Sequence, residues 1–220
     1  MIDSTLLKQT TSIEDALSLI EDASGYGFKC VMLPAPLVLR VKDAAESLGV
    51  SLCTVVGFPS GFQPAEAKIA ELRSVSSYVD EVDVVAPLWA AASGSFEYII
   101  DELSEIVETA REEGVKTVKV IVEAPLFKDN DLQLLIDAVK RAGADYAKTS
   151  TGVYTKGGDP ITVMRVAEYA KPLGLKVKAA GGIRTGLDAL LAIAAGADRI
   201  GTSSARSVLL SYAELVGEQI

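Results

Sequence analysis

Charged side chains stand inside several short apolar runs of this chain, where a charge is costly unless it has a partner or a task. The runs are Glu81-Val-Asp-Val-Val with Asp83, Val118-Lys-Val-Ile-Val-Glu with Lys119 and Glu123, Ala147-Lys-Thr-Ser-Thr-Gly with Lys148, and Val177-Lys-Ala-Ala-Gly-Gly with Lys178. Side chains alternate along a strand, so Lys119 and Glu123 share one face, opposite Val118. If these runs are neighbouring parallel strands, three lysines and two carboxylates converge.

Lys148 and Lys178 each end such a run, directly before a loop rich in glycine, serine and threonine. A lysine amine attacks carbonyl compounds only when unprotonated, so its pKa of about 10.4 must fall by roughly three units, on the order of 4 kcal/mol. A second lysine in the same cavity supplies the repulsion that lowers it. The alternative is a buried ion network without chemistry. Lys176, at the start of its run, is expected to be solvated at the opposite rim.

Two later loops have the residue types of a phosphate site. Gly181-Gly182-Ile183-Arg184 precedes an expected helix, and Gly201-Thr202-Ser203-Ser204 opens the last one. Backbone N–H groups, hydroxyls and two helix N-termini could converge there on one anion. Either loop alone could serve only a tight turn. Together with the lysines, they predict an imine-forming enzyme that acts on a phosphorylated carbonyl compound.

The composition excludes several other classes of site. The 220 residues contain no histidine, which rules out a Ser/His/Asp triad, a Cys/His dyad and a His-ligated zinc ion. The net charge of −9, from 21 Lys and Arg against 30 Asp and Glu, argues against a nucleic-acid partner. Walker A, GxGxxG, GxSxG and Cys/His metal-binding patterns are missing from the sequence. Acid–base chemistry must fall to Lys, Asp, Glu, Tyr or water.

The cysteines and apolar runs indicate where the protein resides. Cys30 and Cys53 lie inside apolar runs, not in a Cys-x-x-Cys pair, and this predicts unpaired core residues in a reducing cytosol. The longest uninterrupted run of apolar residues and glycine, 189–197, is too short to span a membrane. No basic segment followed by a long apolar stretch opens the chain. We therefore expect a soluble, cytoplasmic protein without a membrane partner.

Glycines that stop helical patterns are repeatedly followed by a short apolar or β-branched run. They are Gly27, Gly49, Gly114, Gly143, Gly174 and Gly196. This order is typical of helix-to-strand connections in a parallel sheet. Segments 1–3 and 78–86 bring the expected strands to eight. Amphipathic helices are predicted over 12–24, 37–48, 64–76, 96–113, 131–142, 160–170, 185–195 and 204–215.

Eight strand–helix units over 220 residues average about 28 residues each, which suffices for a closed (β/α)₈ TIM barrel. An open doubly wound sheet is the second choice. No linker or low-complexity tract divides the chain, so one α/β domain over residues 1–220 is expected.

These strings together closely resemble the 2-deoxyribose-5-phosphate aldolase family of class I aldolases. The resemblance adds Ile2-Asp-Ser-Thr-Leu-Leu and Val55-Val-Gly-Phe-Pro-Ser-Gly and covers nearly the whole chain in order; archaeal members look nearest. It implies a (β/α)₈ fold and reversible cleavage of 2-deoxy-D-ribose 5-phosphate to acetaldehyde and D-glyceraldehyde 3-phosphate. It implies neither a metal nor an organic cofactor.

The resemblance also implies residue roles. Lys148 would form the imine, Lys178 would lower its pKa, and Asp83 would relay protons through a water molecule with Lys119 beside it. The phosphate would be held around Gly152, Gly182, Ile183, Gly201, Ser203 and Ser204. We further expect a homo-oligomer whose only other partners are small phosphorylated sugars and aldehydes.

Three positions depart from the usual family pattern. Ser4 stands where many members have His, Leu33-Pro34 where many have Asn-Pro, and Trp89 stands in the loop after Asp83. These differences bear on substrate fit. Two alternatives remain open at this point: another Schiff-base enzyme that resembles transaldolase, and an inactive phosphate-binding barrel.

Overall fold

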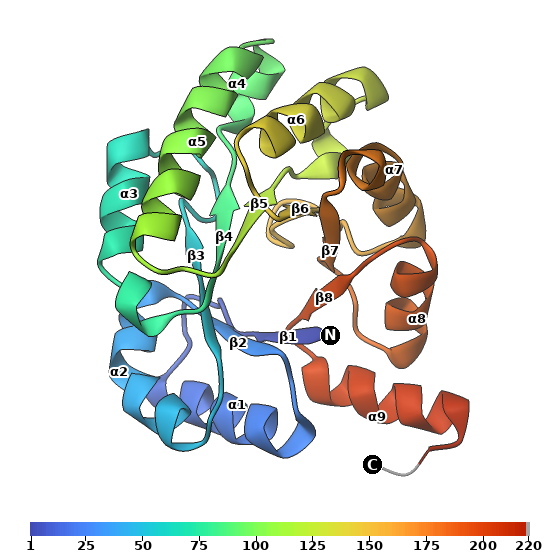
Figure 1. Cartoon of the computed structure of the whole chain (residues 1–220). Coiled ribbons are helices and arrows are strands. Elements are labelled where there is room, and N and C mark those ends of the chain that lie inside the picture. Colours follow the sequence, from blue (N-terminus) through green and yellow to red (C-terminus); the bar gives the residue numbers. More distant parts are fainter. Residues whose placement is uncertain (219–220) are drawn as a thin grey trace.

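Eight parallel strands close into a barrel in the order in which they occur in the chain, and helices surround it (Figure 1). The computed structural model describes residues 1–218. The strands are β1 (Ile2–Thr5), β2 (Cys30–Leu33), β3 (Leu52–Val56), β4 (Glu81–Val85), β5 (Thr117–Ile121), β6 (Tyr146–Lys148), β7 (Lys176–Ala180) and β8 (Arg199–Thr202). The predicted (β/α)₈ barrel is confirmed, and an open sheet is excluded because β8 pairs with β1.

Eight of the helices lie where the sequence predicts them, to within a few residues. The helices are α1 (Ile13–Tyr26), α2 (Ala35–Ser47), α3 (Ala65–Arg73), α4 (Leu88–Ala92), α5 (Phe96–Glu112), α6 (Asp129–Arg141), α7 (Pro160–Ala170), α8 (Gly186–Ala194) and α9 (Ala205–Val216). The short helix α4 is not predicted from the sequence. It carries Trp89, which therefore does not lie in a loop, and whose ring centroid is 5.1 Å from that of Tyr98.

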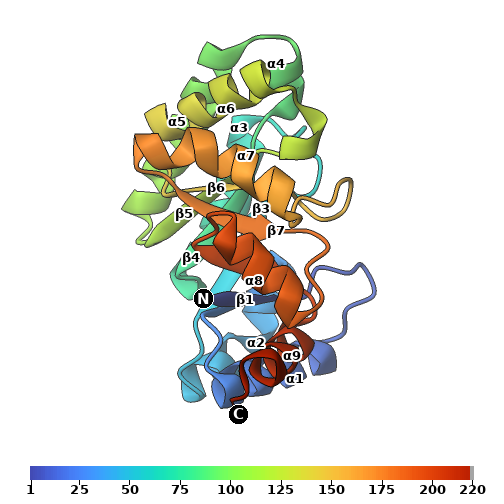
Figure 2. The same cartoon turned by 90° about the vertical axis from the view of Figure 1, so that its right-hand side faces the viewer.

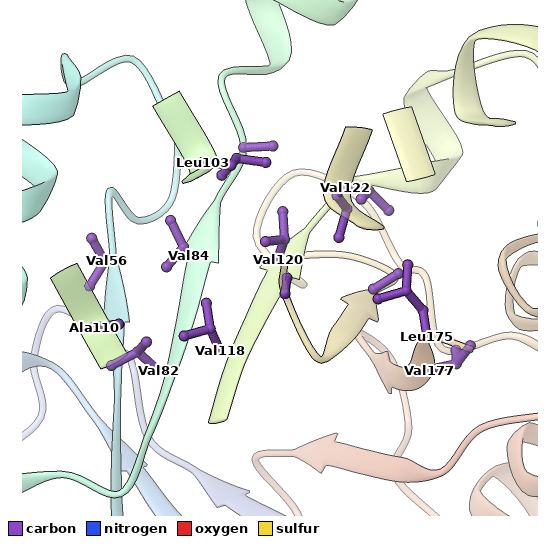
Figure 3. Close-up of a cluster of buried hydrophobic side chains, with 14 of the residues drawn as sticks. Val56, Val82, Val84, Leu103, Ala110, Val118, Val120, Val122, Leu175 and Val177 are labelled. Atoms are coloured by element: carbon purple, nitrogen blue, oxygen red, sulfur yellow. The ribbon is translucent and has the colours of Figure 1, made fainter. Parts of the chain in front are cut away.

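The two faces of the strands carry different side chains: apolar ones face the helices, and charged ones face the barrel axis. On the outer face of β4 and β5, valines pack against α5 in the main hydrophobic core (Figure 3). Val82, Val84, Val118 and Val120 are all fully buried there. The residues between these valines point toward the barrel axis, as period-two alternation requires. The charged side chains of these strands therefore lie inside the barrel.

The helix ends follow from local sequence. At the start of α1, the Ser12 hydroxyl accepts from the Asp15 amide, and the Asp15 carboxylate accepts from the Ser12 amide. These two bonds form a capping box, which satisfies two of the free N–H groups at the helix start. Gly27 ends the helix with a φ of 67°, a left-handed conformation that glycine adopts without strain.

Cys30 and Cys53 form a disulfide inside the barrel. Both are fully buried, but the prediction of two unpaired thiols is wrong. The cysteines are 23 residues apart in sequence, and the pairing of β2 with β3 brings their Cα atoms to 6.1 Å, within disulfide range. Because the two cysteines are paired, they no longer support the prediction of a reducing compartment.

Three helices from the C-terminal part of the chain, α7, α8 and α9, lie along one side of the barrel (Figure 2). The longest apolar run of the sequence belongs to this side, in and after α8. Within residues 1–218, no helix is both long enough and apolar enough to cross a membrane.

Candidate active site

Six buried charged side chains form a closed ring of alternating charge inside the barrel. The ring runs through Lys119, Asp83, Lys178, Asp3, Arg199 and Glu81 and returns to Lys119. The nitrogen–oxygen distances are 2.9 Å for Lys119–Asp83, 2.7 Å for Asp83–Lys178, 2.6 Å for Lys178–Asp3, 2.6 Å for Asp3–Arg199, 3.1 Å for Arg199–Glu81 and 2.7 Å for Glu81–Lys119. Three cations balance three carboxylates, so the ring itself is neutral.

Lys148 is attached to this ring as a seventh charge. Its Nζ donates to Asp83 Oδ2 at 2.7 Å, and Lys178 Nζ donates to the same oxygen at 2.7 Å. Lys119 and Lys178 each pair with two carboxylates, whereas Lys148 pairs with one. Because the ring is neutral without it, Lys148 is the amine whose loss of a proton is least opposed by its neighbours.

The register of the strands sets these groups beside one another. Asp83 of β4 is the Cα partner of Lys119 of β5, and Lys148 of β6 is the Cα partner of Lys178 of β7. Lys148 is the last residue of its strand. Its side chain is 4% exposed, against 1% for Lys178 and 0% for Lys119. Of the three lysines, Lys148 is therefore the one most open to the mouth of the barrel.

The carboxylate at the centre of the cluster stays ionised. Burial alone would raise the pKa of Asp83, but the ammonium groups of Lys119, Lys148 and Lys178 override burial and hold it well below its usual value. Burial likewise opposes ionisation of Asp3, and Lys178 is the first of the cations that lower its pKa. Burial would lower the pKa of Lys119, but the carboxylates, led by Asp83, raise it.

Lys148 behaves differently. Burial lowers its pKa to about 8, and the Lys178 ammonium acts in the same direction, while the Asp83 carboxylate opposes both. About a tenth of the amine is then unprotonated at pH 7. From the sequence, this drop in pKa is expected to come from repulsion by a second lysine. Desolvation is the larger cause, and Lys178 adds to it.

The four predicted catalytic residues, Lys148, Lys178, Asp83 and Lys119, thus lie in one hydrogen-bonded cluster. Glu123 does not join them, contrary to expectation. Strand β5 ends at Ile121, and Glu123 follows it with φ 45° and ψ 51°, so it leaves the strand's alternation.

Lys176 lies where it is expected. It is exposed at the start of β7, and its Nζ is 5.6 Å from the centre of the Tyr146 ring.

Three members of the ring are not predicted from the sequence: Asp3, Glu81 and Arg199. Glu81 carries a period-two signal, because it precedes Asp83 by two residues. Asp3 and Arg199 lie in strands of four residues, which are too short to display an alternation.

The residues predicted to hold a phosphate lie at the carboxyl ends of β6, β7 and β8. They are Gly152, Gly182, Ile183, Gly201, Ser203 and Ser204. The Thr202 hydroxyl donates to the Ile183 carbonyl at 2.7 Å and so ties the ends of β7 and β8 together. Gly201 lies within β8, and a Cβ there would be 2.9 Å from Lys178 Cε. This glycine makes room for the lysine.

Two of the predicted phosphate donors already have protein acceptors. The Gly152 amide donates to Ser150 Oγ at 3.0 Å, and the Ser204 amide donates to Thr202 Oγ1 at 3.0 Å. Both bonds fix the shape of the loops that surround the mouth. An anion would have to compete with them for these two amides.

Two helix N-termini are expected to face an anion, and the N–H groups at the one that begins α8 are already bonded to protein side chains. Thr185 and Asp188 form a capping box there, and the Asp188 carboxylate also accepts from the Arg184 amide. At α9, the side chain of Ser204 makes no capping hydrogen bond. The N-terminus of α9 is therefore the better placed of the two to receive a negative charge.

Within residues 1–218, one group of potential metal ligands is close enough to share an ion: Cys30, Cys53 and Glu81. The two sulfur atoms are bonded to each other, and the Glu81 carboxylate pairs with Lys119 and Arg199. This donor set offers no free thiolate, and its carboxylate is neutralised.

Comparison with known proteins identifies relatives over nearly the whole chain. The model of the DeoC/LacD family of aldolases matches residues 2–211. Deoxyribose-phosphate aldolase from Aeropyrum pernix is 52% identical over 98% of this chain and 90% of its own length. The enzyme of the same name from Streptococcus pneumoniae is 38% identical over 94% of this chain and 93% of its own.

Solved structures agree with the sequence matches. The tetrameric deoxyribose phosphate aldolase from Aeropyrum pernix superposes with a TM-score of 0.93 over 97% of this chain and 90% of that one. An aldolase designated QR15, 32% identical, superposes with a TM-score of 0.89 over 98% of this chain and 96% of its own. The chain belongs to the DeoC/LacD family of aldolases.

Proposed function

We propose that the protein catalyses the reversible cleavage of 2-deoxy-D-ribose 5-phosphate to acetaldehyde and D-glyceraldehyde 3-phosphate, with Lys148 as the imine-forming residue. The observation that carries the proposal is a neutral ring of six charges with one surplus lysine at its edge, whose pKa is lowered to about 8. A binding protein has no need of a desolvated amine. The names of the relatives support the same reaction.

Imine formation begins the reaction. The unprotonated Nζ of Lys148 attacks the C1 aldehyde carbon of the open-chain sugar and forms a carbon–nitrogen bond. The hydroxyl of this adduct takes up a proton from water and leaves as one water molecule, which gives a protonated imine; the proton returns to water when the imine is hydrolysed. A base removes the proton of the C3 hydroxyl, the C2–C3 bond breaks, and its electron pair moves to the iminium nitrogen. Glyceraldehyde 3-phosphate departs; protonation of the enamine at C2 and hydrolysis then release acetaldehyde and restore Lys148.

The neighbours of Lys148 supply charge and proton transfer. Asp83 is held ionised by three lysines, so it stabilises the cationic imine and passes protons through a water molecule without retaining them. Lys119 fixes the other Asp83 oxygen at 2.9 Å. Lys178 lies against the same Asp83 oxygen as Lys148 and keeps the nucleophile's pKa low.

The substrate phosphate is proposed to lie at the ends of β6, β7 and β8, where loop amides and the N-terminus of α9 face the mouth. Gly182, Ile183 and Ser203 would donate backbone N–H groups, and Ser203 and Ser204 would add hydroxyls. Gly152 and Gly201 would contribute by permitting close approach of the backbone.

A parallel assay tests this proposal. The purified protein is offered acetaldehyde or dihydroxyacetone as donor, each with D-glyceraldehyde 3-phosphate as acceptor. Formation of deoxyribose 5-phosphate from acetaldehyde, lost in Lys148→Ala, is the expected result. Product from dihydroxyacetone alone would favour a transaldolase-like enzyme, and product from neither would favour an inactive phosphate-binding barrel.

We also propose that the protein is a cytoplasmic homo-oligomer. A phosphorylated sugar does not cross a bilayer unaided, because its charge is strongly hydrated. The relative from Aeropyrum pernix is a tetramer. Helices α7 and α8 carry exposed apolar side chains that suit contact with a second copy: Ile161, Met164, Leu187, Leu190, Leu191 and Ile193. Both helices lie on the same side of the barrel (Figure 2).

A further inference from the structure

Glu123 is a fully buried carboxylate outside the charged ring, in a backbone conformation that is rare for residues with a side chain. Within residues 1–218 it is the one non-glycine residue with a positive φ. It accepts from the Thr151 amide at 3.1 Å and, through its other oxygen, from the Thr155 hydroxyl. Strained backbone conformations of this kind are concentrated at functional sites, where the surrounding structure holds them in place.

These bonds hold the loop of residues 151–158, which follows Lys148 and leads into α7. A second set of bonds fixes the same loop from the other side. Ser150 Oγ accepts from the Gly157 amide at 3.2 Å, and the Gly158 amide donates to the Gly181 carbonyl at 2.8 Å. The loop is therefore anchored both to Glu123 and to the connection between β7 and α8.

The two connections meet backbone to backbone. A Cβ on Gly158 would lie 2.5 Å from Ile183 Cγ1, and a Cβ on Gly152 would lie 3.2 Å from the Cα of Gly181. Side chains at these glycines would separate the two segments. The close contact holds both ends of the segment between Gly152 and Gly158 against the connection after β7.

Lys156 is the cation that this arrangement brings to the mouth. A Cβ on Gly182 would lie 3.5 Å from Lys156 Cβ and 3.6 Å from its Cγ and Cδ, so the lysine stem runs alongside Gly182. Lys156 is exposed and takes part in none of the ion pairs within residues 1–218. Its ammonium group is thus available next to a residue proposed to bind phosphate.

We propose that Lys156 contacts the substrate's phosphate group and that Glu123 is a positioning residue that holds the loop carrying it. The inference rests on the proposed function for the identity of the substrate. An ammonium group forms strong charge-assisted bonds with a phosphate dianion. In a protein with a net charge of −9, a local cation offsets the general repulsion of that dianion.

Acceptor preference tests the role of Lys156. Acetaldehyde is the donor, and D-glyceraldehyde 3-phosphate is compared with D-glyceraldehyde as acceptor. Lys156→Met keeps the stem and removes the charge, so KM for the phosphorylated acceptor should rise about tenfold, while kcat and the reaction of the other acceptor stay unchanged. Lys140→Met is the matched control, because Lys140 is exposed in the last turn of α6, at the opposite end of the barrel. An equal preference of Lys156→Met and Lys140→Met for the phosphorylated acceptor would overturn the proposal.

Thr155→Val tests the positioning role of Glu123 without replacing the buried carboxylate. It should raise KM for D-glyceraldehyde 3-phosphate. The double variant with Lys156→Met should have the same KM as Lys156→Met alone, because both substitutions act through one contact. Glu123→Gln keeps one oxygen that accepts a hydrogen bond, so it should retain more of the preference for the phosphorylated aldehyde than Glu123→Ala. A fall in melting temperature without any change in acceptor preference would make Glu123 merely structural.

Calorimetric titration with inorganic phosphate separates this inference from the proposed function. Weaker phosphate binding by Lys156→Met than by Lys140→Met supports the inference, and equal binding contradicts it, whatever sugar the protein cleaves. Failure of the wild-type protein to cleave deoxyribose 5-phosphate would instead refute the proposed reaction.

Discussion

The number of carboxylates around each buried lysine distinguishes the nucleophile from its neighbours. Lys119 and Lys178 each meet two carboxylates and complete the neutral ring, whereas Lys148 meets one. A buried surplus charge is costly, so the cluster lowers the pKa of Lys148 and raises the fraction of neutral amine. The same cluster then accepts the positive charge of the imine beside Asp83.

Replacing Lys178 by Leu should move the pH dependence of the reaction. The Lys178 ammonium is one cause of the lowered pKa of Lys148, so its removal lets that pKa rise above about 8 while desolvation still opposes the charge. Since the reaction needs the unprotonated amine, kcat/KM should fall most near pH 7 and recover partly at higher pH. A pH–rate profile parallel to that of the wild type, only lower, would contradict an electrostatic role; the apparent pKa belongs to the coupled pair.

Asp83→Asn should separate imine formation from proton transfer. The amide keeps the shape of the side chain but loses the charge, so turnover should fall by roughly 10²-fold or more. Exchange of the acetaldehyde methyl protons with D₂O should slow in parallel, while borohydride still traps the imine. Because three lysines share this carboxylate, a melting curve is the necessary control. Wild-type turnover would show that Asp83 serves only the fold.

The residues with chemistry could be predicted where a charge stands inside an apolar run of the sequence. Asp83, Lys119, Lys148 and Lys178 meet that condition. Asp3 and Arg199 lie in strands of four residues, and no local pattern shows that their side chains meet each other across the junction of β1 and β8. The pairing of the two cysteines likewise depends on the register of neighbouring strands.

At the scale of elements, the loops after β6 and β7 act as one unit because their glycines leave no space between them. Gly181 could not bear a Cβ without meeting Ser150 Oγ at 2.5 Å. The contact couples the segment after the nucleophile to the segment proposed to bind phosphate.

Gly158→Ala should disturb this unit. Its Cβ would meet Ile183 Cγ1 at 2.5 Å and the Gly181 carbonyl oxygen at 2.7 Å. We expect a loss of about 1–3 kcal/mol in the free energy of unfolding and weaker binding of phosphorylated substrate. Gly25→Ala is the matched control: it lies in α1 with nothing within 4 Å of its Cβ and should raise stability by about 0.5–1 kcal/mol. Unchanged melting and KM in Gly158→Ala would refute the coupling.

Two helix starts follow from capping boxes that can be read in the sequence. Ser12 with Asp15 and Thr185 with Asp188 both begin helices as capping boxes. Helix α4 has no such signal: it is a five-residue apolar segment without a capping hydrogen bond from a side chain. Its existence depends on packing beside α5, which local propensity does not encode.

At the scale of the whole molecule, a chain with net charge −9 holds its cationic cluster inside the barrel and an apolar surface on α7 and α8. Barrel closure is predictable from the repeat of eight strand–helix units. The number of subunits is not predictable, because it depends on how copies of this surface fit together.

Leu187→Glu combined with Leu191→Lys should reduce the assembly state. The two substitutions form an i, i+4 pair that supports the helix itself while charging its exposed apolar face. The sedimentation coefficient should fall relative to the wild type, with the fold retained by circular dichroism. Leu126→Glu, at another exposed leucine, should sediment as the wild type does. Identical sedimentation of all three proteins would exclude the exposed face of α8 as the interface.

Borohydride trapping shows which lysine forms the imine. The protein is incubated with acetaldehyde, reduced, digested and examined by mass spectrometry. We expect one ethyl group on Lys148 and none on Lys119 or Lys178, because only Lys148 combines a lowered pKa with access to the mouth. Labelling of Lys178 instead, or labelling that persists in Lys148→Ala, would contradict this assignment.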